Sequence, residues 1–166
     1  MSRVYVSIGS NIDPMANVRS AVAALRAHYG ELVVSPVYET GAVGFSGADF
    51  LNLVVGFDTG EPPETVAAVL RELEAGHGRR RGSGGKLASR TLDLDLLTHG
   101  DVVAERDGLH LPRGEILEYA FVLRPLSDIA GDAVHPVVGR SYRALWAAFD
   151  ASGQPMRRAV LRLGGP

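Results

Sequence analysis

The chain has 166 residues, with 17 Lys and Arg against 19 Asp and Glu, a net charge of −2 and no cysteine. This charge balance excludes a general electrostatic attraction to nucleic acid or to anionic membranes, and the lack of cysteine excludes disulfides and thiolate metal sites. The N-terminus is too short and polar for a signal peptide, and no apolar run reaches the roughly 20 residues that span a bilayer. We therefore expect a cytoplasmic protein without membrane or nucleic-acid partners.

The pattern of apolar residues predicts strands and helices in a regular order over the first 100 residues. Strands are indicated at 4–8, 31–40, 49–58 and 91–100, and helices at 13–30 and 61–78. In the first helix the apolar residues Val18, Val22 and Leu25 recur at helical spacing. Beyond residue 100 the pattern is less regular and predicts a turn at 111–114 and short helices at 115–119 and 142–149.

The order strand, helix, strand, strand, helix, strand is typical of an α+β protein with a ferredoxin-like βαββαβ core. We expect an antiparallel sheet with both helices packed on one face, short C-terminal additions, and a free second face that serves as the working surface. A chain of this length forms one ordinary hydrophobic core, so we expect a single domain over 1–166.

An acidic pair lies in the fourth predicted strand, in "SRTLDLDLL" at residues 89–97. Alternation places Asp93 and Asp95 on one face and Leu92, Leu94 and Leu96 on the other. The carboxylates would lie roughly 7 Å apart, which is twice the strand rise. Two such groups can hold Mg²⁺ together with substrate phosphates. An exposed, solvated strand face explains the same tripeptide without any ligand.

A basic, glycine-rich loop precedes this strand. Its cations and glycines are Arg79, Arg80, Arg81, Lys86 and Gly78, Gly82, Gly84, Gly85, and Arg90 follows. Arginines neutralise phosphate oxygens and glycines let a loop close over a ligand, so a phosphate-binding loop is one interpretation. A solvated linker is the second. A nucleic-acid patch is a third, but the aromatic motif of RNA-binding sheets is not found.

Phe50 and Asn52 are predicted on the face that lacks helices, because they alternate with Leu51 and Leu53. An aromatic ring and an amide there could stack on and hydrogen-bond a flat heterocycle. A structural asparagine with internal partners is the alternative.

Together these segments resemble the 6-hydroxymethyl-7,8-dihydropterin pyrophosphokinase family. The resemblance runs in order from about Val4 to Phe149, through "VYVSIGSN", "SPVYET", "DFLN", "LEAGHGR", "SRTLDLDLL", "LHLP" and "FVLRPLSDIA". The most specific piece is "RTLDLD". The resemblance implies transfer of the β,γ-pyrophosphoryl group of ATP to the hydroxymethyl oxygen of the pterin, with release of AMP and a requirement for two Mg²⁺ ions.

The resemblance also assigns roles by position. The metal ligands would be Asp93 and Asp95, and the catalytic residues Arg79, Arg90 and Asp95. Either Asp95 or a metal-bound oxygen would help to deprotonate the hydroxyl. The pterin pocket would consist of Thr40, Val43, Phe50, Asn52 and Phe121. The ATP site would consist of Arg71, Glu74, Arg79, Lys86, Arg90, Leu109, His110 and Arg113. We expect small-molecule partners and a monomer.

The chain departs from the family pattern at several positions. Leu87 stands near a common tryptophan and Ser89 replaces a proline. Arg113 stands at a common histidine and could replace its charge, whereas Tyr119 stands at a common arginine and cannot. The alternatives to an active pyrophosphokinase are a divergent relative that binds ATP and a heterocycle with slow or different transfer, and a ferredoxin-like binding module without chemistry.

Overall fold

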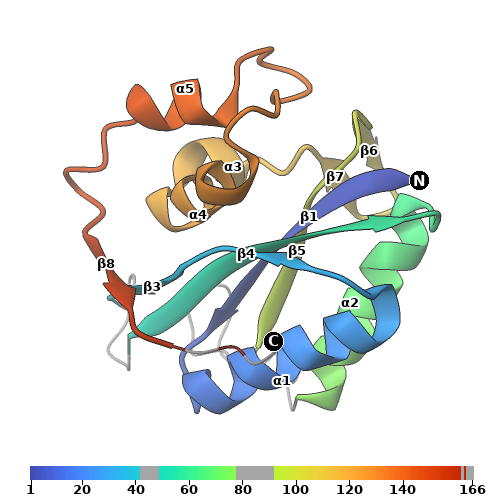
Figure 1. Cartoon of the computed structure of the whole chain (residues 1–166). Helices are drawn as coiled ribbons and strands as arrows, with labels where there is room; N and C mark the ends of the chain where they lie inside the picture. Colours follow the sequence, from blue (N-terminus) through green and yellow to red (C-terminus); the bar gives the residue numbers. More distant parts are fainter. Residues whose placement is uncertain (42–48, 78–91, 162, 164–166) are drawn as a thin grey trace.

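The computed structural model describes residues 1–41, 49–77, 92–161 and 163 (Figure 1). The strands are β1 (Ser2–Ser10), β2 (Val33–Val34), β3 (Val37–Thr40), β4 (Phe50–Thr59), β5 (Asp93–His99), β6 (Ala104–Arg106), β7 (Leu109–Leu111) and β8 (Met156–Ala159). The helices are α1 (Pro14–Tyr29), α2 (Pro63–Gly76), α3 (Glu115–Glu118), α4 (Ala120–Ala130) and α5 (Tyr142–Ala147). All six strands and helices predicted within residues 1–100 are present, and Pro36 separates β2 from β3.

The main sheet is antiparallel and has the order β5-β1-β4-β3-β8, with β2 also paired to β4. The four predicted strands thus adopt the ferredoxin-like order, which confirms the fold class. In the central register Gly9 of β1 lies opposite Asp93 of β5 on one side and opposite Asn52 of β4 on the other. Strands β6 and β7 form a separate two-stranded sheet.

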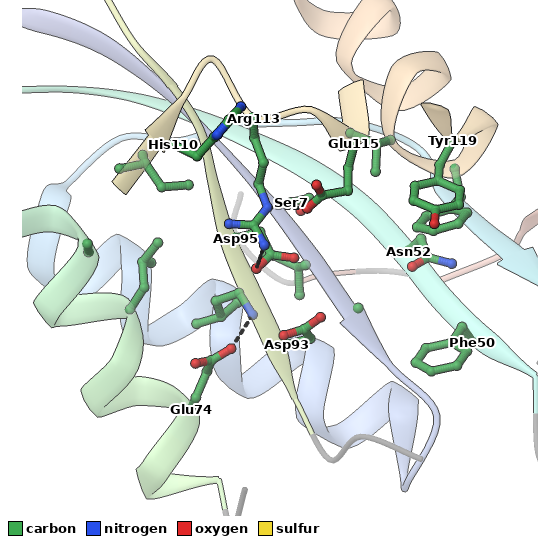
Figure 2. Close-up of a pocket in the computed structure, with 18 of the residues that line it drawn as sticks. Ser7, Phe50, Asn52, Glu74, Asp93, Asp95, His110, Arg113, Glu115 and Tyr119 are labelled. Atoms are coloured by element: carbon green, nitrogen blue, oxygen red, sulfur yellow. Dashed lines mark hydrogen bonds and ion pairs between the residues drawn. The ribbon is translucent and has the colours of Figure 1, made fainter. Parts of the chain in front are cut away.

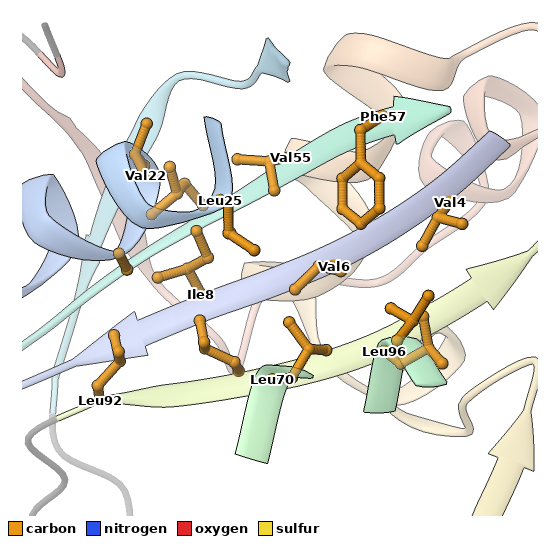
Figure 3. Close-up of a cluster of buried hydrophobic side chains, with 14 of the residues drawn as sticks. Val4, Val6, Ile8, Val22, Leu25, Val55, Phe57, Leu70, Leu92 and Leu96 are labelled. Atoms are coloured by element: carbon orange, nitrogen blue, oxygen red, sulfur yellow. The ribbon is translucent and has the colours of Figure 1, made fainter. Parts of the chain in front are cut away.

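One face of the sheet carries the larger hydrophobic core, against which α1 and α2 pack (Figure 3). Alternate residues of β1, β4 and β5 point into it, because successive strand residues face opposite ways. These include Val4, Val6 and Ile8 of β1, Leu53, Val55 and Phe57 of β4, and Leu94 and Leu96 of β5. The core therefore fixes which face of each strand is left for polar residues.

The opposite face is covered over part of its length, which corrects the expectation of a free face. A second buried cluster joins Val54 of β4 and Leu97 of β5 to Leu123 and Leu126 of α4 and Tyr142 of α5. Helix α4 was not predicted, because Pro125 lies inside it and proline normally interrupts a helix. Large apolar residues on both sides of β4 and β5 require this second layer. The polar part of this sheet face lies beside the layer formed by α4 and α5.

Two further differences concern the C-terminal half. Strand β8, with the sequence Met-Arg-Arg-Ala, was not predicted because it is short and half of its residues are charged, and it pairs at the sheet edge with β3. The β6–β7 hairpin was likewise not predicted. The predicted short helices are present, as α3 and α5, with α5 ending at Ala147 rather than at 149.

We expect Leu53→Ala to destabilise the fold, because Leu53 is fully buried in the middle of β4. The loss of a buried leucine side chain leaves a cavity and lowers the free energy of unfolding by about 2–5 kcal/mol. Urea denaturation followed by circular dichroism measures this. Val103→Ala is the matched control, because Val103 is 61% exposed and its truncation is expected to change stability by less than about 0.5 kcal/mol. Equal effects of the two would contradict the assigned core.

Candidate active site

A cavity of about 790 Å³ opens on the polar part of the sheet face (Figure 2). Its walls come from β1, β4, β5 and the end of β3, from α2, from β7, and from α3 with the start of α4. The polar or charged residues that line it include Ser7, Thr40, Asn52, Arg71, Glu74, Asp93, Asp95, His110, Arg113, Glu115, Glu118 and Tyr119. Thus the structure brings most of the predicted site residues into one cavity.

The acidic pair lies at the start of β5 and lines this cavity. As predicted, Leu94 and Leu96 are buried on the opposite face, while Asp93 and Asp95 are half-buried. The residues opposite the pair in β1 are Gly9 and Ser7, which are small. Because neither fills the space above the strands, the carboxylates have room beside them for a ligand.

Arg113 is a cation in contact with one member of the acidic pair, Asp95. Its Nη2 lies 3.4 Å from Oδ1 of Asp95, and its Nε donates a hydrogen bond to Glu115. Its backbone N–H donates to the carbonyl of Leu97 at 2.9 Å. Burial by itself would lower the pKa of Arg113, but the negative charges of Asp95 and Glu115 outweigh it and raise the pKa overall. Arg113 is therefore cationic at any physiological pH.

Glu74 connects α2 to the edge strand β5. Its Oε2 accepts a hydrogen bond of 2.8 Å from the backbone N–H of Leu94, between the two aspartates (Figure 2). An edge strand has backbone donors that are not used within the sheet, and a carboxylate is a strong acceptor for one of them. Glu74 thus holds in place the segment that carries the acidic pair.

An aromatic and amide wall lies on the other side of the cavity. Asn52 is 7% exposed, and its Nδ2 donates a hydrogen bond of 2.9 Å to Oγ1 of Thr40. A Cβ atom at Gly9 would lie 3.0 Å from Oδ1 of Asn52, so a larger residue there would press on the amide. The rings of Tyr119 and Phe121 stack at 4.9 Å with an interplanar angle of 22°. With Phe50, these groups can accommodate a flat polar ring.

The remaining predicted residues divide into two groups. Arg71, Leu109 and His110 line the cavity, and Nδ1 of the exposed His110 lies 2.6 Å from Oε1 of Glu105. Val43, Arg79, Lys86 and Arg90 lie outside the described residues, as do Leu87 and Ser89.

Three of the polar lining residues, Ser7, Glu115 and Glu118, were not named in the sequence analysis. Ser7 could have been found from the alternation of β1, in which it is a polar residue opposite the core. The two glutamates follow an irregular segment, and no local periodicity indicates that they reach the cavity.

The donor set is limited to oxygen and nitrogen groups. Within the described residues no three His, Asp or Glu side chains gather in a way that could hold a metal ion by themselves. A pair of carboxylates suits Mg²⁺, which takes one or two protein carboxylates and completes its coordination with phosphates and water. In the same residues no helix is long and apolar enough to cross a membrane.

Sequence comparisons match the chain to one family of known proteins. Residues 5–131 match the family model of 7,8-dihydro-6-hydroxymethylpterin-pyrophosphokinase. The chain is 37% identical over 157 residues to the 2-amino-4-hydroxy-6-hydroxymethyldihydropteridine pyrophosphokinase of Methylorubrum extorquens, which covers 92% of this chain and 97% of that protein. It is 36% identical over 129 residues to the enzyme of the same name from Bacillus subtilis, covering 75% and 76% of the two chains.

The fold also matches solved structures of longer proteins. The chain resembles Plasmodium falciparum HPPK-DHPS crystallised with pteroate, at a TM-score of 0.69 and 13% identity, over 88% of this chain and 42% of that one. A second structure, of HPPK-DHPS in complex with substrates, gives a TM-score of 0.70 at 11% identity, over 92% and 44%. The chain thus spans less than half of these solved chains, and the likeness concerns the fold alone. The match of residues 5–131 and the curated relatives show that the chain belongs to the 7,8-dihydro-6-hydroxymethylpterin-pyrophosphokinase family.

Proposed function

We propose that the cavity catalyses the reaction of this family, in which the β,γ-pyrophosphoryl group of ATP moves to the hydroxymethyl oxygen of 6-hydroxymethyl-7,8-dihydropterin. The oxygen forms a bond to the β-phosphorus, the bond between the β-phosphorus and the α,β-bridging oxygen breaks, and AMP leaves. One observation carries the proposal. The acidic pair and the aromatic and amide wall lie in one cavity, so a phosphate chain and a flat ring can meet there.

Asp93 and Asp95 would hold the Mg²⁺ ions, of which we expect two. When bound, the ions would neutralise phosphate charge and orient the phosphate chain. The fit rests on two half-buried carboxylates on one strand face, with small residues opposite them. We also assign to Asp95 the role of accepting the hydroxyl proton.

Cations of the chain would stabilise the charge of the transferring group. Arg113 has a raised pKa and lines the cavity beside Asp95. We assign Arg79 and Arg90 the catalytic charge neutralisation, with Arg71 and Lys86 as further ATP contacts. Glu74, Leu109 and His110 complete the proposed ATP site. Such transfer depends chiefly on position and charge rather than on covalent chemistry by the protein.

The pterin would lie against the aromatic and amide wall. Phe50 and Phe121 would flank the ring, and Asn52 would bond to its polar edge. The hydrogen bond from Nδ2 of Asn52 to Thr40 supports this, because it fixes the orientation of the amide. The other amide atom, Oδ1, then lies on the side that faces Gly9. Val43 would complete the pocket. We further propose that residues 1–166 form one domain, that the protein is a monomer and that it acts in the cytoplasm.

The direct test is to incubate the protein with Mg-ATP and 6-hydroxymethyl-7,8-dihydropterin and to separate the nucleotide and pterin products. We expect AMP and pterin diphosphate in equal amounts, because a single pyrophosphoryl group moves. Formation of ADP would indicate transfer of one phosphoryl group and contradict the proposed reaction. ATP that binds but stays intact would instead favour the divergent-relative alternative.

Asp95→Asn is expected to lower kcat by roughly 10²-fold or more, because the amide loses the charge that the phosphate-bound ions require. Its effect on metal-dependent binding of a non-hydrolysable ATP analogue can be measured by calorimetry. Asp101→Asn is the matched control, since Asp101 is exposed just beyond β5. If Asp95→Asn binds the Mg²⁺ complex of the analogue as tightly as the unchanged protein, Asp95 is not a metal ligand.

Gly9→Ala is expected to raise the KM for the pterin, because the added Cβ would lie 3.0 Å from Oδ1 of Asn52 and displace the amide. A displacement of this kind typically weakens binding by roughly tenfold, equivalent to one lost hydrogen bond. The KM for ATP should change much less. Gly60→Ala serves as the control, since a Cβ atom added there would meet no atom of a non-adjacent residue within 4 Å. An unchanged KM for the pterin in Gly9→Ala would contradict the assignment of Asn52 to the pterin pocket.

A further inference from the structure

Gln154 makes an unusual pair of contacts at the edge of the cavity. It lies between α5 and β8, beyond the residues 5–131 that match the family model. Its Oε1 accepts a hydrogen bond of 2.8 Å from the backbone N–H of Ala120, and its Nε2 donates one of 3.0 Å to the carbonyl of Glu118. These two backbone groups lie on either side of Tyr119, so one side-chain amide bridges the chain across that residue.

The bridge lies where two helices meet. Tyr119 lies between the last residue of α3 and the first residue of α4, with extended backbone angles φ of −122° and ψ of 127°. The last carbonyls of a helix and the first N–H groups of the next have no partner within their own helix. In the part of the chain that the structure describes, the side chain of Tyr119 does not cap α4. Gln154 therefore caps both helices at once, from more than thirty residues away.

This junction determines where two aromatic rings lie. Tyr119 and Phe121 both line the cavity, and their rings stack at 4.9 Å. Figure 2 shows Tyr119 on the same side of the cavity as Asn52 and Phe50, away from Glu74. The direction of a side chain follows the backbone angles of its residue. A change at the junction would thus turn both rings relative to the cavity.

The same C-terminal segment also contacts the other side of this wall. Strand β8 begins two residues after Gln154, and Met156 lies opposite Thr40 in the register with β3. Thr40 accepts the hydrogen bond from Asn52. Residues 154–156 therefore connect the backbone of the aromatic wall to the strand that orients the amide.

We propose that Gln154 is a positioning residue for recognition of the heterocycle. Its amide holds the backbone on both sides of Tyr119 and so directs the rings of Tyr119 and Phe121 at the bound ring. The proposal rests on the proposed function, in which this wall contacts the pterin. Gln154 itself does not line the cavity, and it acts through the two backbone groups that it bonds.

Gln154→Met tests this, because methionine has a similar length but makes neither hydrogen bond. We expect the Kd for 6-hydroxymethyl-7,8-dihydropterin, measured by calorimetry, to rise about five- to tenfold, as for the loss of a helix cap. The Kd for a non-hydrolysable ATP analogue should stay within about twofold of its value in the unchanged protein, since Asp93 and Arg113 lie outside the junction of α3 and α4. Gln154→Glu keeps an acceptor for Ala120 but loses the donor, so its effect should be intermediate.

The bridge that Gln154 makes across Tyr119 can be followed directly by amide hydrogen exchange over residues 118–123. We expect this exchange to be faster in Gln154→Met than in the unchanged protein. Ser141→Ala is the matched control. Oγ of Ser141 caps α5 by accepting from the N–H of Ala144 at 3.1 Å, and α5 packs on α4. This variant should lose similar stability without a change in pterin affinity.

The possible outcomes separate the two proposals. If amide exchange at 118–123 is unchanged in Gln154→Met, Gln154 does not hold the backbone around Tyr119. If the exchange is faster but the Kd for the pterin is unchanged, Gln154 has no role in recognition of the heterocycle. An equal loss of pterin affinity in Ser141→Ala would also overturn that role, since it would reflect general destabilisation. Failure of the unchanged protein to bind the pterin would contradict the proposed function, even if the exchange data supported the bridge across Tyr119.

Discussion

The organisation of the whole protein depends on the register of three antiparallel strands, β5, β1 and β4. Gly9 of β1 lies between Asp93 on one neighbour and Asn52 on the other. The same alternation directs Ile8, Leu53 and Leu94 into the core on the opposite face. A shift of one residue in either pairing would exchange the two faces, burying the acidic pair and exposing leucines. The apolar core thereby enforces the alignment of a carboxylate and an amide across the sheet.

Charge is the second constraint on this face. Two carboxylates on alternate residues of one strand repel each other, and burial makes the repulsion larger. Arg113 offsets part of this through Asp95, and it is held between Asp95 and Glu115. Arg113, which the sequence suggested as a substitute for a histidine, is thus also a counterion of the acidic pair. Its raised pKa keeps it charged throughout the physiological pH range.

The C-terminal third converts a sheet face into a cavity. Helices α4 and α5 cover the apolar part of the face through Val54 and Leu97, which leaves the polar part open beside them (Figure 1). The junction of α3 and α4 then supplies an aromatic wall, and Gln154 and β8 connect that wall to β3. The described residues proposed to contact the pterin therefore come from β3, β4 and the start of α4.

The sequence by itself determined the order of the first six strands and helices, the faces of β4 and β5, and the location of Asp93, Asp95, Phe50 and Asn52 on one face of the sheet. These features rest on local periodicity, which is readable wherever one face of an element is buried. Only the tertiary structure decided that α4 forms despite Pro125, that Glu74 bonds to the backbone of Leu94, and that Gln154 bridges Tyr119. Those contacts join residues up to 36 positions apart, and their energies depend on packing and on backbone groups that no local pattern encodes.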